Sequence, residues 1–263
     1  MIVFGAIIPH SPLLIPSIGK DQREKLKVTI DAISQIEQAL YLAKPETIVI
    51  IGPHGPRYPD AFSTNMAGSY TGTLKSFGDF STTISAKSDY MLIDRAHRKM
   101  REEDIPFTLT SSEELDYSFT IPILLLTQHL QNWKLIPISP SMMDGKAHYE
   151  FGRQIKRVLH MEKRRVAVIA SADLSHKLSA DSPGGLSKEG QQFDEMIQKT
   201  VLLDDPTQLL TMPAEIIENS GQCGYRPICT LLGMFDKMNV ARQMLSYEAP
   251  FGVGYMTAKF DIA

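Results

Sequence analysis

Metal-competent side chains follow three apolar runs of the sequence. The run IVFGAIIPH ends in His10, TIVIIGPH ends in His54, and VAVIASADLSH contains Asp173 and ends in His176. Runs rich in β-branched residues are typical of buried strands, and the carboxyl ends of neighbouring parallel strands meet at one edge of a sheet. Imidazole and carboxylate groups bind divalent metals and transfer protons. The pattern therefore predicts one site assembled from three distant segments.

A single histidine after a strand is more often a loop residue or a hydrogen-bonded structural group than a ligand. Three such placements together favour a functional site. His10 and His54 each follow a proline, whose fixed φ stiffens the backbone before the imidazole. A stiff backbone suits a ligand that must be held in place.

The alternation of strand and helix patterns predicts one α/β domain spanning residues 1–263. Helical spacing is clearest over residues 21–45, 120–131, 148–160 and 188–203, and two closing strands are expected at 241–250 and 252–260. Residues 57–85 suggest irregular β structure that could shape a pocket over the site. We expect a mostly parallel or mixed central sheet flanked by helices, with the site at its carboxyl edge.

Composition limits the partners and the compartment. The chain has 263 residues, 43% of them hydrophobic, and a formal net charge of -3, so it lacks the basic field of a nucleic-acid binder. No apolar run is long enough to cross a membrane, and the N-terminus lacks the basic start of a signal peptide. Two cysteines form no disulfide framework. We expect a cytoplasmic protein with a small-molecule partner; a homo-oligomer is compatible with the sequence.

Cys223 lies between Gly221 and Gly224, just before a helix expected to begin near Arg226. Because helix N-termini lower thiol pKa values, we expect a reactive thiol exposed to the cleft. Cys229, one turn into the helix, is expected to be buried. The Arg226 guanidinium could bind an anionic substrate group or pair with a carboxylate.

The sequence resembles the LigB superfamily, which comprises class III extradiol ring-cleavage dioxygenases and Memo-like proteins. Five ordered segments carry the resemblance: IIPHSPLLIP, IGPHGP, SADLSHKL, QCGYRPI and SYEAPFGVGY. It is strongest to the bacterial and archaeal branch associated with the AmmeMemoRadiSam system. The set is specific, whereas any one segment alone would be weak.

The resemblance implies roles for individual residues. His10 and His54 match the two histidine ligands of a divalent metal, most often Fe(II) in the dioxygenases. His176 matches the acid/base near the substrate, and Asp173 matches an aspartate that contributes to the metal site in the Memo-like branch. We expect Asp173 to orient His176.

The third ligand departs from the ring-cleaving pattern. Those enzymes use a glutamate, whereas the matching position here holds Cys223, as in the Memo-like branch; Glu248 and Glu218 are the carboxylate alternatives. A thiolate is compatible with iron, zinc or copper. Tyr117 is a second departure, because many family members have a histidine there. A phenol titrates near 10 and is a poor proton shuttle at neutral pH.

Two functions follow from the resemblance. The first is a non-haem metal-dependent extradiol dioxygenase that opens a catechol-like aromatic ring with O2. The alternative is a Memo-like metal-binding or partner-binding protein that has the same fold without ring cleavage.

The remaining histidines lie among charged residues, and we expect them on the surface: His97, His129, His148 and His160.

Overall fold

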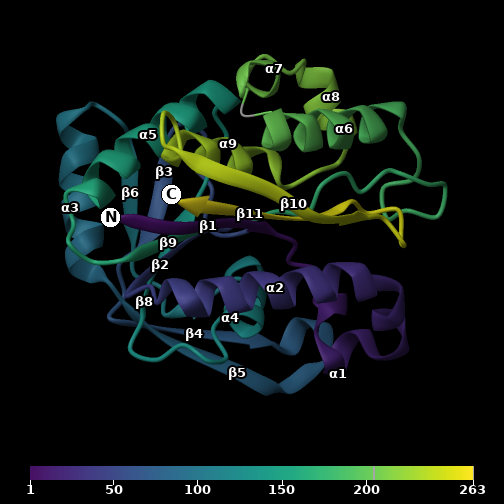
Figure 1. Cartoon of the computed structure of the whole chain (residues 1–263), viewed down its shortest axis with the longest axis horizontal. Helices are drawn as coiled ribbons and strands as arrows, with labels where there is room; N and C mark the ends of the chain where they lie inside the picture. The colour runs from purple at the N-terminus through teal and green to yellow at the C-terminus, as the bar shows by residue number, and fades with distance from the viewer. Residues whose placement is uncertain (204, 263) are drawn as a thin grey trace.

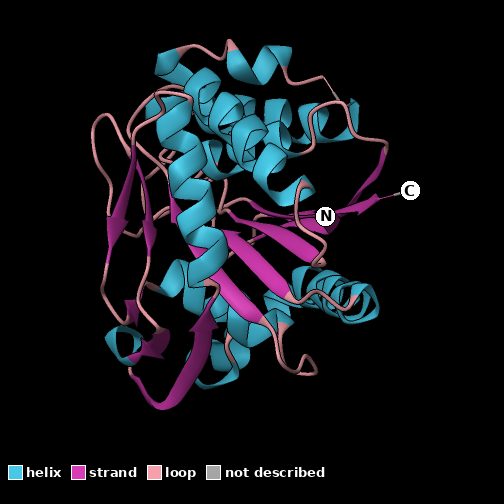
Figure 2. Cartoon of the chain, turned by 90° about the vertical axis from the view of Figure 1, so that its left-hand side faces the viewer, coloured by secondary structure: helices cyan, strands magenta, loops and turns pink. Residues whose placement is uncertain are grey.

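A twisted mixed sheet runs through the centre of the computed structural model, which describes residues 1–203 and 205–262 (Figures 1 and 2). Within these residues the sheet has eleven strands, with β10-β11-β1-β9-β2-β8-β5-β4-β7 in order and β3 joined to β8 and β6. The strands are β1 (Ile2–Ile8), β2 (Thr47–Ile51), β3 (Phe62–Asn65), β4 (Ser69–Leu74), β5 (Asp79–Ser88), β6 (Phe107–Thr110), β7 (Glu114–Leu115), β8 (Lys134–Ser139), β9 (Val166–Ser171), β10 (Val240–Glu248) and β11 (Tyr255–Ile262).

The three strands that precede the predicted site residues are neighbours. Strand β9 pairs in parallel with β1 on one side and with β2 on the other, and Ile8 lies opposite Ser171. Strands β10 and β11 close this side of the sheet in antiparallel fashion. The carboxyl ends of β1, β9 and β2 therefore meet at one edge, as predicted, and the sheet is mixed.

Helices cover both faces of the sheet (Figure 1). One face carries α2 and α4, and the other carries α3, α5, α6 and α9. The helices are α1 (Pro16–Gly19), α2 (Lys27–Ala43), α3 (Tyr90–Glu102), α4 (Tyr117–Leu126), α5 (Gly145–His160), α6 (Lys188–Leu203), α7 (Thr207–Leu210), α8 (Ala214–Asn219) and α9 (Tyr225–Met234), with 3-10 turns at Pro12–Leu14, Lys20–Leu26 and Lys75–Phe77.

The central strands are buried on both faces, which explains their continuous apolar sequences. Successive residues alternate between two cores: Ile7 packs with α5 and α9, while Ile8 packs with α2 and α4. Strand β9 alternates in the same way through Val168 and Ile169. A rigid two-sided core thus fixes the strand ends from which the site is built.

Helix α4 begins at Tyr117, three residues before the predicted start, and ends at Leu126 rather than near residue 131. The earlier start follows from Asp116, whose carboxylate accepts a hydrogen bond from the N–H of Ser118 at 2.7 Å and caps the helix. This shift matters because it places Tyr117 and Ser118 in the first turn, at the sheet edge that carries the site.

The expectation that His148 is a surface residue was wrong. Its side chain is fully buried in α5, with the ring edge-on to Phe62 and Nδ1 bonded to the carbonyl of Asp144 at 2.7 Å. Position 148 shares a helix face with Phe151 and Ile155, so helical spacing outweighs its polar neighbours.

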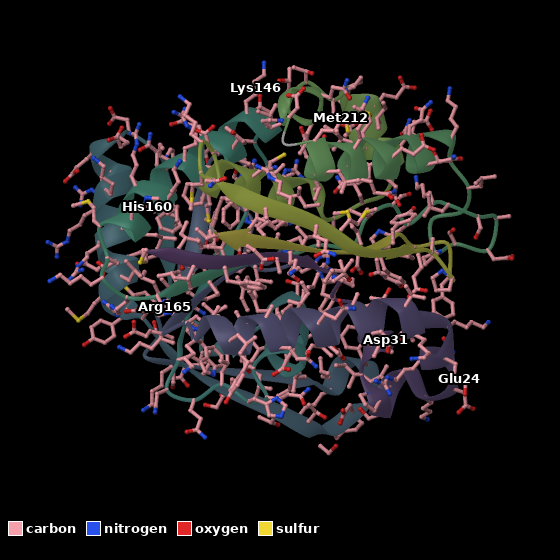
Figure 3. All side chains as sticks on the ribbon, viewed as in Figure 1. Glu24, Asp31, Lys146, His160, Arg165 and Met212 are labelled. Carbon is pink, nitrogen blue, oxygen red and sulfur yellow. The ribbon has the colours of Figure 1, made fainter. Side chains whose placement is uncertain are left out.

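Of the four histidines expected on the surface, the three other than His148 are partly or fully exposed. His97 is half-buried on α3, and His129 is exposed in the loop after α4, where it contacts Glu37. His160 is exposed at the end of α5, at the periphery of the molecule (Figure 3).

Among the described residues, no helix is both long and apolar enough to cross a bilayer.

Candidate metal centre

His10 and His54 point at each other across the ends of β1 and β2. Their Nε2 atoms are 3.2 Å apart, and the rings meet edge to face. His10 is almost fully buried, whereas His54 is half-buried. Two imidazole nitrogens that face each other from two rigid strand ends could bind the same metal ion.

Cys223 adds a third donor from the segment before α9. Its Sγ lies 3.5 Å from Nε2 of His10, and the donor atoms of His10, His54 and Cys223 all lie within 4.8 Å of one another. In a tetrahedral site with ordinary bond lengths, two nitrogens are about 3.4 Å apart, and a nitrogen and a sulfur about 3.6 Å apart. The three residues therefore fit a single metal ion.

The tautomer of His10 follows from its partner Ser171. The Ser171 hydroxyl donates to the carbonyl of Ser118 at 2.6 Å, and its Oγ lies 2.9 Å from Nδ1 of His10. A hydroxyl has one proton, so Nδ1 of His10 must be the donor in this second contact. Nε2 of His10 is then left with a free lone pair facing His54 and Cys223, as a metal ligand requires.

Ser118 supports both histidines. Its carbonyl accepts the Ser171 hydroxyl, and its own hydroxyl accepts the backbone N–H of His54 at 3.4 Å. The first turn of α4 thus links the ends of β2 and β9. Neither Ser118 nor Ser171 was predicted, because a serine acting behind a ligand has no distinctive spacing in the sequence.

Burial keeps both imidazoles neutral at physiological pH. It lowers the pKa of His10, against the opposing effect of the Asp173 carboxylate. It also lowers the pKa of His54 to about 4, with help from the nearby His10. Metal binding requires neutral imidazole, so no proton has to be displaced from either ring near pH 7.

Asp173 anchors His10 through the main chain. The Asp173 Oδ1 accepts a hydrogen bond from the backbone N–H of His10 at 2.8 Å, and the Asp173 Oδ2 lies 3.9 Å from Nε2 of His10. The carboxylate is buried beside the cluster. It therefore fixes the strand end that carries His10 and places a negative charge next to the three donors.

His176 lies beyond β9, in a loop held from two sides. The backbone N–H of Ser175 donates to the buried carboxylate of Asp194 at 2.8 Å, and Nδ1 of His176 contacts the carbonyl of Gly221 at 2.5 Å. The Gly221 carbonyl, rather than the expected Asp173 carboxylate, therefore orients the ring. Because a carbonyl only accepts, Nδ1 carries the proton and Nε2 is left as the basic nitrogen. His176 also lowers the pKa of His10, which places it within electrostatic range of the cluster.

The thiol of Cys223 differs from the expectation of a low pKa. Burial and the negative charge of Asp173 raise its pKa well above the ordinary value. The residue precedes the N-cap Gly224, and its Sγ lies 3.6 Å from the carbonyl of Asp173, so it lies outside the helix and against an acceptor. Cys229 is fully buried, as predicted. A thiolate at position 223 would therefore need a positive charge close by, such as a metal ion.

Comparison with known proteins places these residues in a family. The model for the catalytic LigB subunit of aromatic ring-opening dioxygenase matches residues 5–258. The chain belongs to the LigB family.

Its relatives include Memo-like proteins. A MEMO1 family protein of Methanosarcina barkeri is 25% identical over 250 residues, covering 94% of this chain and 79% of the relative. Protein CA_C1420 of Clostridium acetobutylicum is 24% identical over 264 residues. The aligned region covers 97% of this chain but only 56% of the length of CA_C1420. The fold also matches uncharacterized protein JW3007 from Escherichia coli K12, with a TM-score of 0.67, 15% identity, and coverage of 98% and 99% of the two chains.

In this LigB family protein, Tyr117 lies against the metal-site histidines. Its ring stacks on His54 at 4.9 Å between centroids and meets His10 edge-on at 5.7 Å. Burial and the proximity of Cys223 raise the pKa of the phenol. Tyr117 therefore stays protonated at neutral pH and packs against the two candidate metal ligands.

The two carboxylate alternatives to Cys223 lie elsewhere. Glu248 accepts hydrogen bonds from the backbone N–H and the hydroxyl of Thr29, at 2.8 and 2.5 Å. Glu218 is exposed on α8. Among the described residues, the metal-competent group consists of His10, His54 and Cys223.

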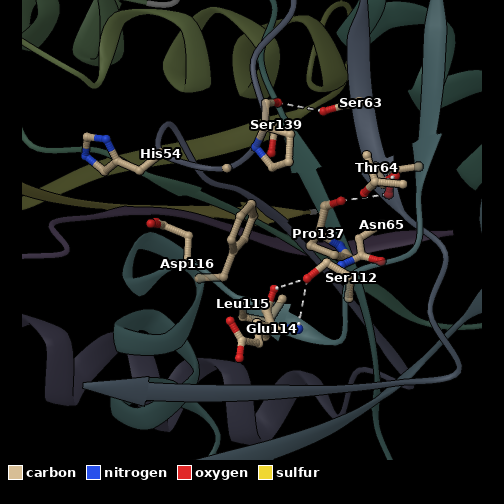
Figure 4. Close-up of a pocket in the computed structure, with 14 residues that line it drawn as sticks. His54, Ser63, Thr64, Asn65, Ser112, Glu114, Leu115, Asp116, Pro137 and Ser139 are labelled. Carbon is tan, nitrogen blue, oxygen red and sulfur yellow. Dashed lines mark hydrogen bonds between the residues drawn. The ribbon is translucent and has the colours of Figure 1, made fainter. Parts of the chain in front are cut away.

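A cavity of about 420 Å³ opens beside His54 in this LigB family protein. Figure 4 shows the His54 imidazole at one end and Thr64 and Asn65 at the other. Strand β3, which lies in the segment predicted to shape a pocket, supplies Ser63, Thr64 and Asn65 to its wall. The side chains of these three residues bond to backbone carbonyls, so the wall is polar and fixed in shape.

Proposed function

We propose that this protein is a metal-dependent dioxygenase that opens a catechol-like aromatic ring with O2. The observation that carries the proposal is the convergence of His10, His54 and Cys223 on one point, with separations that suit a single ion. The ring-opening description of the family model supports the same chemistry.

The donor set allows several metals. We propose Fe(II) as the metal. Zinc and copper are the alternatives, because both also bind sulfur donors. When bound, the metal would supply the Lewis-acid and redox chemistry that brings the substrate oxygens to react with O2.

Each residue near the site has a proposed task. His10 and His54 hold the metal, and Ser171 keeps the His10 lone pair directed at it. His176, with Nδ1 bonded to Gly221, uses Nε2 to take a proton from a substrate hydroxyl and to return one later. Asp173 contributes indirectly by fixing the backbone of His10.

The second candidate function is that of a Memo-like metal-binding or partner-binding protein without ring cleavage. Cys223 favours it, because a thiolate beside bound O2 is open to oxidation. Tyr117 also favours it, because the phenol occupies the place of a second proton shuttle and stays protonated. Both candidate functions rest on the same donor group of His10, His54 and Cys223.

Activity on catechols separates the two candidates. Protein purified without oxygen would be analysed for metal, loaded with Fe(II), and exposed to a panel of catechols in air-saturated buffer. The dioxygenase predicts O2 uptake and a yellow ring-opened product, both lost in His54→Ala and retained in the exposed control His129→Ala. Stoichiometric metal binding without product from any catechol would support the Memo-like alternative.

For location, we propose the cytoplasm. Both cysteines are free, as is usual in a reducing compartment. The formal charge of -3 gives no support for a nucleic-acid partner, so the proposed partners are the small aromatic substrate and O2.

A further inference from the structure

Asp194 is a buried carboxylate outside the metal site. Its side chain lies on α6, and the residue is only 1% exposed, on the helix face that packs into the core through Phe193 and Ile197. No lysine or arginine among the described residues forms an ion pair with it. Burying a charge without a counter-charge is costly unless hydrogen bonds replace the lost water. Its hydrogen-bond partners therefore show which part of the molecule it stabilises.

The two oxygens of Asp194 join α6 to two other segments. Oδ1 accepts a hydrogen bond from the backbone N–H of Ser175 at 2.8 Å, in the loop after β9. Oδ2 accepts one from the hydroxyl of Tyr247 at 2.8 Å, on β10, which α6 contacts (Figure 1). Gly254 leaves room for the carboxylate, because a Cβ at that position would overlap Oδ2. The carboxylate is thus fixed next to the residue that precedes His176.

The loop that carries His176 is held along its whole backbone. Each N–H from residue 174 to residue 178 donates a hydrogen bond to another group. Four acceptors are uncharged: the carbonyl of Gly254 for Leu174, the carbonyl of Ser220 for His176, the Ser175 hydroxyl for Lys177 and the carbonyl of Gly252 for Leu178. The acceptor for the N–H of Ser175 is the Asp194 carboxylate. Because a hydrogen bond to a charged group is about twice as strong as a neutral one, the firmest anchor of the loop lies one residue before His176.

This anchor bears directly on the imidazole of His176. Nδ1 of the ring contacts the carbonyl of Gly221 at 2.5 Å, and this contact leaves Nε2 as the basic nitrogen. Gly221 belongs to the segment that leads to Cys223, whereas Ser175 is tied to α6. The ring therefore lies between two fixed segments, and a shift of the Ser175 backbone would move it away from Gly221.

The charge of Asp194 also acts on this loop. Burial raises the pKa of Asp194 to about 6, while the Ser175 N–H, the Tyr247 hydroxyl and the charge of a protonated His176 act in the opposite direction. At pH values above about 6 the carboxyl is therefore ionised, and both of its oxygens can accept hydrogen bonds. Among the described residues, these three groups are the ones that face Asp194 from the loop and from β10.

We propose that Asp194 is a positioning residue for His176. Through the N–H of Ser175, its carboxylate fixes the main chain so that the imidazole keeps Nδ1 on the Gly221 carbonyl and Nε2 free to exchange protons. This inference rests on the proposed role of His176 as the acid/base of the reaction. Asp194 acts through the backbone of Ser175 rather than on the substrate.

The tautomer of His176 tests the inference without turnover. Nitrogen-15 NMR at neutral pH, on protein loaded with Zn2+, which has no redox chemistry, distinguishes the two ring nitrogens, and His176→Gln assigns their signals. We expect Nδ1 alone to carry the proton in the unmodified protein, and both tautomers to be populated in Asp194→Ala. Asp194→Asn should restore the single tautomer, because its amide oxygen can still accept from the N–H of Ser175.

A matched control and a second measurement guard against a folding defect. Glu195→Gln removes a carboxylate from the exposed side of α6 and should leave the His176 tautomer unchanged. If Asp194→Ala does not fold, the Ser175 amide proton of the unmodified protein decides, because its resonance should shift as Asp194 takes up a proton near pH 6. A single Nδ1–H tautomer in folded Asp194→Ala, or a Ser175 amide that does not respond near that pH, would overturn the inference.

Turnover gives a further readout if the Fe(II) protein opens catechols. Asp194→Ala should then lower kcat by about tenfold to a hundredfold, the scale of a misplaced acid/base group, with metal content and KM little changed. Asp194→Asn should recover most of this loss. A fall in metal content that matches the fall in kcat would contradict a role limited to His176.

The two proposals fail in distinguishable ways. A mixed His176 tautomer in Asp194→Ala, in a protein that opens no catechol, would overturn the dioxygenase function and leave the positioning of the ring standing. Ring opening with the same kcat and the same tautomer in Asp194→Ala would do the opposite.

Discussion

The Oγ of Ser171 lies 2.9 Å from Nδ1 of His10 and directs the free lone pair of that imidazole at His54 and Cys223. The serine is the last residue of β9, and its own proton is committed to the carbonyl of Ser118 at 2.6 Å. The Ser171 hydroxyl has one proton but two hydrogen-bond partners. Nδ1 of His10 must therefore carry the proton in their shared contact. The fold itself therefore fixes the His10 tautomer that metal binding needs.

Ser171→Ala should weaken metal binding by about tenfold to a hundredfold, the usual cost of losing an outer hydrogen bond to a ligating histidine. The measurement is a competition titration with a metal-sensitive chelating dye. Ser246→Ala is the matched control, because that buried hydroxyl has no hydrogen-bond partner among the described residues and lies on β10, at one end of the strand order. Unchanged affinity in Ser171→Ala would show that the hydroxyl does not support His10.

His10→Ala and His54→Ala should each abolish tight metal binding, whereas His176→Ala should retain most of it. The two strand-end imidazoles meet within 3.2 Å, while Nδ1 of His176 is bonded to Gly221 and the ring stands outside the donor group. Metal content after dialysis reports the difference. Equal loss of bound metal in all three variants would show that His176 is itself a ligand. That result would favour a zinc or copper site.

Gly224→Ala should reduce metal affinity about as much as Cys223→Ala. A Cβ at position 224 would lie 2.8 Å from the carbonyl oxygen of Asp173, so the segment carrying the thiol would have to move. Gly68→Ala is the control, since a Cβ there meets nothing within 4 Å. A Gly224→Ala protein with normal affinity would mean that the position of the sulfur is unimportant for binding.

Acidification should destabilise the metal-free protein through His148. Burial lowers the pKa of this imidazole to about 4, below its ordinary value near 6.5. Between these values the unfolded chain binds a proton that the folded chain does not, so stability is lost as the pH falls from about 6.5 towards 4, by up to about 1.4 kcal/mol per pH unit. The lowered pKa values of His10 and His54 act in the same direction.

The variant His148→Asn isolates that contribution. Asparagine can still donate to the carbonyl of Asp144 but does not titrate, so the slope of unfolding free energy against pH should become shallower. Phe151→Leu should lower stability by lost packing with the slope retained. An unchanged slope in His148→Asn would show that this histidine does not contribute.

The sequence predicted the strand ends well because the signal is local. Apolar runs such as that of β9 are short, continuous and followed directly by polar residues, and the order β1-β9-β2 then brings them together. The start of α4 was misplaced because a capping aspartate at position 116 is weaker as a signal than the apolar run that follows it.

Features that depend on three-dimensional burial were not predictable. The thiol of Cys223 was expected to ionise easily from its place before a helix, but burial and the Asp173 carboxylate act in the opposite direction. The supporting role of Ser171 depends on a carbonyl from another segment, that of Ser118. These contacts join residues fifty or more positions apart, and the spacing of residues in a single sequence does not reveal them.

X-ray absorption at the metal edge of the loaded protein tests the central claim most directly, because it reports the ligand atoms themselves. The account predicts imidazole nitrogens at about 2.1 Å and one sulfur at about 2.3 Å, the usual zinc distances, with the sulfur contribution lost in Cys223→Ser. A first shell of nitrogen and oxygen without sulfur in the unmodified protein would contradict a site formed by His10, His54 and Cys223.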